Sequence, residues 1–103
     1  IQPETNRLLL QLEQLLRKVN REVINLKENL TFDKLRVFIQ IVAKCRDAYL
    51  KRLFDLPAAH DKHKTFPQKE LAELETLRER LLDLADGAKS IEISIQRGYL
   101  DLK

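Results

Sequence analysis

The feature that most constrains the fold of this chain is a seam of seven apolar residues, spaced alternately three and four positions apart. The seam consists of Leu9, Leu12, Leu16, Val19, Val23, Leu26 and Leu30. On an α-helix this spacing places the side chains on one face, as the a and d positions of a heptad repeat. No proline or glycine interrupts the chain from Glu4 to Leu56. The pattern predicts a long helix whose apolar face is covered by other helices, as ordinary bundle core.

The composition favours long amphipathic helices over a β-rich or disordered chain. Of the 103 residues, 44% are hydrophobic and 34% are charged, and there are only two glycines and three prolines. This balance is typical of helical proteins. The length predicts a single domain over 1–103. A chain of this size has a thin core, so association with another chain would add to its stability.

Local signals predict the first two helices. Pro3 suits a first helical turn, and we expect a helix over 4–29. The heptad pattern loses phase after Leu30, where Thr31 can cap a following helix. A new apolar register then predicts a second helix over 32–56, joined to the first by a tight turn.

The remainder of the chain predicts a loop and a third helix. The stretch 57–66 has no apolar periodicity and is expected to be a loop. Thr65 and Gln68 have capping-box spacing, so a third helix is expected over 67–101. Gly87 could stop this helix, although the apolar register continues through it without a change of phase.

Together these elements predict an all-α fold, an antiparallel bundle of three long helices, or four if the last is broken at Gly87. The segment 91–95 also alternates apolar and polar residues, which is a strand pattern. A lone strand would have no pairing partner in a helical chain, so a helix is the favoured interpretation there.

The second helix carries more apolar residues than one packing face needs. Its surplus stripe could contact a second neighbour inside the bundle or another chain, and the sequence favours neither. The favoured function is a non-catalytic protein–protein interaction or self-assembly module that forms a homo-oligomer. Its candidate interface residues are Val37, Ile41, Ala48, Phe54, Ile93 and Tyr99.

The charge distribution offers an alternative function, nucleic-acid binding. The net charge is +3, and residues 34–64 carry eight basic against three acidic side chains. The candidate contacts are Arg36, Lys44, Lys51, Arg52, Lys62 and Lys64. The acidic residues Asp47 and Asp55 interrupt this stripe, which disfavours phosphate binding. Residues 65–86 are acidic, so charge pairing between neighbouring helices is the simpler interpretation.

No residue pattern indicates catalysis. His60 and His63 flank Asp61 and are suitable metal ligands by type, but no third or fourth ligand is evident, so we predict a solvated loop and no metal site. Cys45 falls on an apolar helical register and is expected to be an inert, buried thiol. Two isolated glycines cannot form a phosphate-binding loop. We therefore predict that the protein is not an enzyme, with no catalytic residues and no cofactor.

The single cysteine excludes an internal disulfide and predicts a cytoplasmic protein. The longest apolar runs are three residues, far below the roughly 20 that span a membrane. The sequence contains no methionine and begins with Ile-Gln-Pro-Glu. We therefore expect that the sequence is not a complete translation product as written, and that it is either an excised domain or a trimmed chain.

Overall fold

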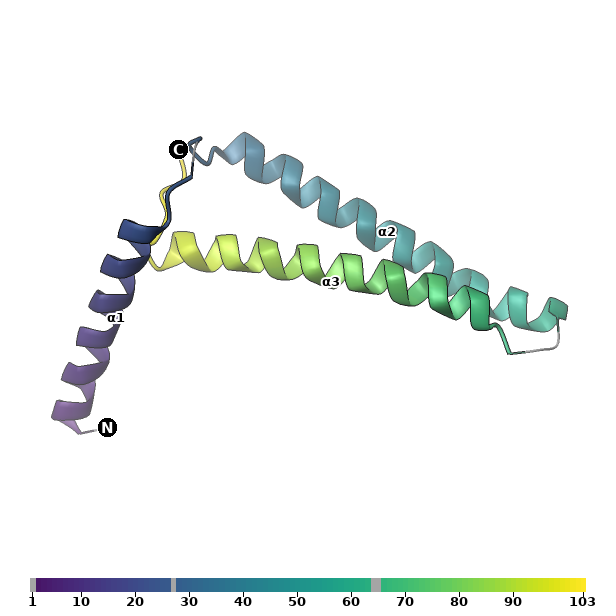
Figure 1. Cartoon of the computed structure of the whole chain (residues 1–103), viewed down its shortest axis with the longest axis horizontal. Coiled ribbons are helices and arrows are strands. Elements are labelled where there is room, and N and C mark those ends of the chain that lie inside the picture. Colours follow the sequence, from purple (N-terminus) through teal and green to yellow (C-terminus); the bar gives the residue numbers. More distant parts are fainter. Residues whose placement is uncertain (1, 27, 64–65) are drawn as a thin grey trace. The chain divides into compact units, whose positions relative to one another are not determined.

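The computed structural model describes residues 2–26, 28–63 and 66–103. Its three helices are α1 (Pro3–Val23), α2 (Phe32–His63) and α3 (Gln68–Gln96) (Figure 1). The part of the chain that is described contains no strand. The predicted all-α class and the number of helices are confirmed.

The chain divides into two compact units. One unit joins Ile1–Lys34 to Ser90–Lys103, and the other consists of Leu35–Lys89. Helix α3 contributes its final two turns to the first of these units and its remaining length to the second.

In the second unit, α2 and α3 lie side by side and run in opposite directions, which forms a helical hairpin (Figure 1). The buried side chains are Val42 on α2 and Leu74 and Leu81 on α3. An ion pair of 3.3 Å joins Arg52 on α2 to Glu73 on α3. The hairpin core is thin, as the length of the chain predicts.

In the first unit, the end of the chain pairs with the segment between α1 and α2. The backbone N–H of Lys103 donates to the carbonyl of Leu30 at 2.8 Å, and the N–H of Phe32 donates to the carbonyl of Lys103 at 3.2 Å. This is the hydrogen-bond pattern of neighbouring parallel strands. Thr31 Oγ1 accepts from the N–H of Lys34 at 3.1 Å, so the predicted cap is present.

Helix α1 ends at Val23 instead of continuing to residue 29 as expected. Ile24 has extended backbone angles, so Leu26 and Leu30 continue the heptad spacing in sequence without belonging to the helix. The backbone near Leu30 is instead bonded to the end of the chain. The helical part of the seam therefore has five members.

The predicted loop over 57–66 was wrong for residues 57–63, because α2 continues through Pro57 to His63. A proline inside a helix removes one backbone hydrogen bond, here the one to the carbonyl of Leu53. Two residues with high helix propensity, Ala58 and Ala59, follow it. The helix tolerates the loss of one bond and extends for two further turns.

Helix α3 passes through Gly87 without a break, and the segment 91–95 is helical. It ends at Gln96, five residues before the expected boundary. The end is set by Gly98, whose φ of 75° lies in the left-handed region that glycine adopts without strain. None of the described helices is both long and apolar enough to cross a membrane.

Candidate interaction interface

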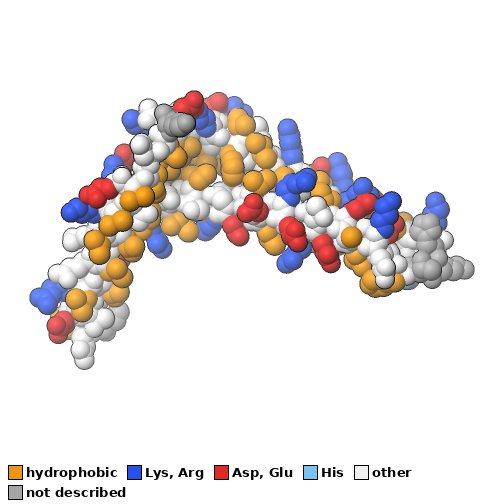
Figure 2. Space-filling view, viewed as in Figure 1, with side chains coloured by type: hydrophobic (Ala, Val, Ile, Leu, Met, Phe, Trp, Pro, Cys, Tyr) orange, Lys and Arg blue, Asp and Glu red, His pale blue; other side chains and the backbone are white. Residues whose placement is uncertain are grey.

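Helix α1 has no buried residue, although it is the most amphipathic of the three helices. Eight aliphatic side chains along it are at least 38% exposed: Leu8, Leu9, Leu10, Leu12, Leu15, Leu16, Val19 and Val23. Figure 2 shows hydrophobic side chains in a row along this helix. The predicted core face of the first helix is therefore exposed.

Seven of these residues form one continuous surface, which we call the α1 face: Leu8, Leu9, Leu12, Leu15, Leu16, Val19 and Val23. At 3.6 residues per turn they occupy an arc of about 120° centred on Leu12. Leu8 and Leu15 widen the a and d seam to three positions in seven, a width typical of a helix that packs against other helices. Gln14 and Lys18 lie on the opposite side of α1.

The C-terminal tail contacts α1 on a different side from the centre of the α1 face. At the end of α3, the N–H of Tyr99 donates to the carbonyl of Ser94 at 2.8 Å. The N–H of Gly98 donates to the carbonyl of Ile95 at 3.1 Å. This pair of bonds is the Schellman motif, which ends a helix with a left-handed glycine. The carbonyls of Arg97 and Gly98 are left to accept other donors.

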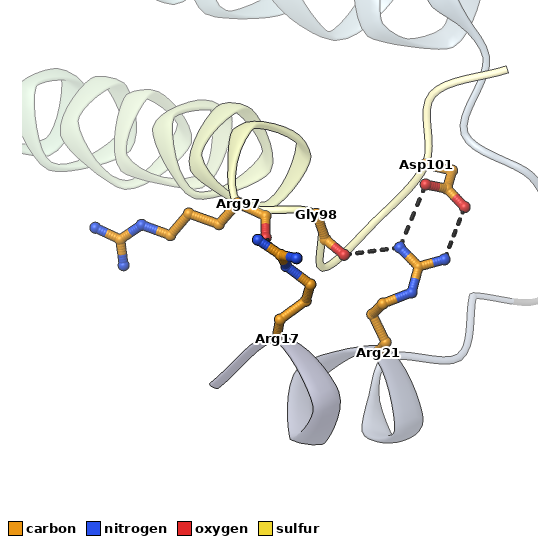
Figure 3. A network of polar contacts seen from close by, with 5 residues as sticks. All are labelled: Arg17, Arg21, Arg97, Gly98 and Asp101. Atoms are coloured by element: carbon orange, nitrogen blue, oxygen red, sulfur yellow. Dashed lines mark hydrogen bonds and ion pairs between the residues drawn. The ribbon is translucent and has the colours of Figure 1, made fainter. Parts of the chain in front are cut away.

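Two arginines of α1 supply those donors (Figure 3). Arg17 Nε donates to the carbonyl of Arg97 at 3.3 Å, and Arg21 Nη1 donates to the carbonyl of Gly98 at 2.7 Å. Arg21 also forms a bidentate contact with the carboxylate of Asp101, in which Nη1 donates to Oδ1 at 3.3 Å and Nη2 donates to Oδ2 at 3.0 Å. Both guanidinium groups thus lie at the C-terminal end of α3, where the helix dipole favours positive charge.

The electrostatics of this contact follow from the Arg21–Asp101 pair. Hydrogen bonding from Arg21, reinforced by its charge, lowers the pKa of Asp101 below its usual value. The same hydrogen bond, together with the negative charge of Asp101, raises the pKa of Arg21. Both side chains are exposed, so water screens the pair. We interpret it as a contact that orients the tail.

A shallow groove of about 480 Å³ lies beside the α1 face, between α1 and the end of α3. Leu9, Leu12 and Leu16 line one wall, and Gln96 and Tyr99 line the other. The Schellman motif and the two arginine contacts therefore place an aromatic ring at the edge of the exposed aliphatic surface. Tyr99 is one of the six interface residues predicted from the sequence.

The other predicted interface residues differ in exposure. Val37, Ile41 and Phe54 on α2 are 43%, 44% and 76% exposed. Ala48 and Ile93 are half-buried. None of the six residues predicted from the sequence belongs to the α1 face, because the apolar seam of the first helix was expected to be bundle core.

Among the predicted nucleic-acid contacts, Lys51 and Arg52 form ion pairs with carboxylates. Lys51 lies 2.9 Å from Asp47, whose hydrogen bond and charge raise the pKa of Lys51. Arg52 pairs with Glu73 across the hairpin. Arg36, Lys44 and Lys62 are exposed, and Lys64 lies outside the described residues. Of the two carboxylates that interrupt the basic stripe in the sequence, Asp47 is therefore in contact with a basic group of that stripe.

The histidines and the cysteine that the sequence offered as candidate ligands or nucleophile all lie on α2. His60 lies on α2, with Nδ1 at 3.8 Å from the carboxylate of Asp61. The side chain of His63 lies outside the described part of the chain. Cys45 is a free, half-buried thiol on α2.

No family model matches this sequence, and neither the curated proteins nor the solved structures contain a significant match.

Proposed function

We propose that this protein is a non-catalytic helical module that associates with a second copy of itself through the α1 face. The observation that carries the proposal is the exposure of seven aliphatic side chains in one continuous stripe. A stripe at heptad spacing is the kind of surface that packs against another helix. Contiguous apolar surface of this kind marks interaction sites on monomeric proteins.

The size of the apolar face supports association of useful strength. Fully burying an aliphatic side chain contributes roughly 1.5–3 kcal/mol, so seven side chains that are about half exposed retain roughly 5–10 kcal/mol per copy. Two copies then contribute roughly 10–20 kcal/mol, against an association cost of about 4–15 kcal/mol. The balance favours a reversible complex with a dissociation constant on the order of micromolar.

The surroundings of the basic residues support a protein partner over a nucleic acid. Lys51 and Arg52 are paired with carboxylates, so binding phosphate would first require breaking these contacts. On α1, Arg17 and Arg21 already donate to the C-terminal tail. The single cysteine needs no oxidising compartment, which supports a cytoplasmic setting.

A matched pair of substitutions tests the proposal. Leu12→Glu places a charge at the centre of the α1 face, whereas Gln14→Glu places the same charge on the opposite side of the same helix. Analytical ultracentrifugation should give a concentration-dependent dimer for the unaltered chain and for Gln14→Glu. Leu12→Glu should weaken association at least tenfold, because the carboxylate would be buried in an apolar contact. Circular dichroism checks that all three chains stay equally helical.

Two outcomes would refute self-association through this face. A monomeric unaltered chain would indicate that the α1 face is covered within one chain. Equal dimerisation of Leu12→Glu and Gln14→Glu would indicate that the chain associates through a different surface, such as the exposed apolar residues of α2.

A further inference from the structure

Building on the proposed self-association, we infer that the α1 helices of two copies pair in antiparallel orientation about a two-fold axis near Gln14. In this arrangement Leu12 faces Leu16 of the second copy, and Leu9 faces Val19 of the second copy. The inference follows from the positions of apolar and charged residues along the helix that the structure defines.

The length of α1 selects the register. In an antiparallel pair the a positions of one helix lie opposite the d positions of the other. With the axis near Gln14, Leu9 meets Val19 and Leu12 meets Leu16, and each contact occurs twice. Only the outermost layer, where Thr5 meets Val23, lacks an aliphatic residue on one side. A shift by one heptad towards the C-terminus would leave Leu9 without an opposing helical residue, because α1 ends at Val23, and would bring Leu15 beside Glu22 at the edge of the seam. A shift in the other direction would leave Val19 and Val23 without opposing helical residues.

The edges of the seam select the orientation. Leu8 and Leu15 lie along one edge, and Glu13 and Asn20 lie along the other. Antiparallel helices bring like edges together, so Leu15 meets Leu15 of the second copy close to the axis. A parallel pair would instead bring unlike edges together and bury the leucines against polar residues.

The charges along α1 favour the same orientation. Residues 3–13 carry two acidic side chains and one basic one, whereas residues 14–23 carry three basic side chains and one acidic one. Antiparallel pairing places each negative half beside a positive half and sets the two helix dipoles in opposite directions, so that the N-terminus of each helix lies beside the C-terminus of the other. Glu13 comes near its counterpart, and Arg17 one turn away offsets that repulsion.

The area matches a reversible dimer. Fully burying an aliphatic side chain contributes roughly 1.5–3 kcal/mol, which at about 25 cal/mol per Å² corresponds to roughly 60–120 Å² of apolar surface. Fourteen half-exposed side chains, seven from each copy, then bury roughly 400–850 Å² of apolar area. If about 65% of the interface is apolar, as in homodimers, the total buried area is about 650–1,300 Å². This lies at the lower end of specific interfaces. We therefore expect the dimer to dissociate on dilution.

Cysteine cross-linking tests the orientation directly. In a Cys45→Ala background, Leu9→Cys and Val19→Cys would be prepared separately, with Gln14→Cys as the control on the opposite side of α1. After mild oxidation, an equal mixture of the first two should form a covalent dimer. Neither should do so alone, because ten residues separate the two copies of position 9 along the axis. That is about 15 Å, beyond the reach of a disulfide.

Sedimentation of the reduced samples separates the possible failures. Efficient self-linking of Leu9→Cys alone would show a parallel pair, which overturns the inference and leaves self-association intact. A reduced dimer that gives no cross-link above the Gln14→Cys control would show that the α1 helices do not pair in this orientation and register, which overturns the inference. A strictly monomeric reduced chain would overturn both the inference and the proposed function.

Discussion

Gly98 and Arg21 determine how the end of α3 meets α1. Gly98 supplies the left-handed turn, and Arg21 binds both its carbonyl and the carboxylate of Asp101. The sequence predicted the Thr31 cap because a cap depends on a neighbour three residues away. It could not predict the Arg21–Asp101 pair, because nothing local connects two residues that lie eighty positions apart.

The two glycines should respond oppositely to substitution by alanine. Gly98→Ala should lower the free energy of unfolding by about 1 kcal/mol, since the left-handed conformation is strained for alanine. Its Cβ would also lie 3.3 Å from Arg17 Nε. Gly87→Ala should raise the free energy of unfolding by about 0.5–1 kcal/mol, because Gly87 is helical. Its Cβ would lie at an ordinary 3.9 Å from Phe38.

Urea unfolding at a fixed protein concentration measures both changes, since association couples stability to concentration. A destabilising Gly87→Ala together with a neutral Gly98→Ala would contradict the Schellman assignment and the uninterrupted α3.

The tail contact should weaken in acid. Arg21 lowers the pKa of Asp101 in the folded chain, so the contribution of this pair is complete above the ordinary aspartate pKa of about 4. It is lost as the pH falls through the lowered value. Glu28 also has a lowered pKa, caused by Lys34, so a site-specific probe is needed.

NMR titration of the Asp101 carboxyl and of the Gly98 and Tyr99 amides follows this change. The amide shifts should track the carboxyl, and Asp101→Asn should abolish the transition. Amides that titrate identically in Asp101→Asn would assign the change to another group.

At the scale of the helices, the sequence predicted where each helix begins better than where it ends. Pro3 and Thr31 are strong initiation signals, and α1 and α2 begin at the expected positions. The ends were wrong for different reasons. Val23 has no local stop signal, and the chain beyond it is extended and bonds to the end of the chain at Leu30. Pro57 looks like a stop but costs only one hydrogen bond.

Pro57→Ala should stabilise the last two turns of α2, because alanine restores the missing N–H to the carbonyl of Leu53. The gain should be up to about 3 kcal/mol in local stability. Hydrogen exchange of amides 58–62 reports it as slower exchange. Pro67→Ala, immediately before α3, serves as the control and should change little, since proline is tolerated at a helix start. Faster exchange in Pro57→Ala would contradict a continuous helix through this position.

At the scale of the whole molecule, the sequence predicted the all-α class and the number of helices, but it expected the apolar face of the first helix to be covered as bundle core. Heptad spacing shows that a face must be covered, and it does not show which surface covers it. Four of the six expected interface residues lie on α2, whereas none belongs to the α1 face, whose seven aliphatic side chains are exposed. Tyr99 was singled out from sequence, and the structure places it at the edge of that stripe.

Sedimentation equilibrium of the unaltered chain tests self-association most directly. Measurements from about 1 µM to about 1 mM span the dissociation constants that the area of the α1 face supports. The average mass should rise smoothly from that of one chain towards that of two. It should change little with added salt, because the contact is apolar. A mass that stays at one chain over the whole range would contradict the account.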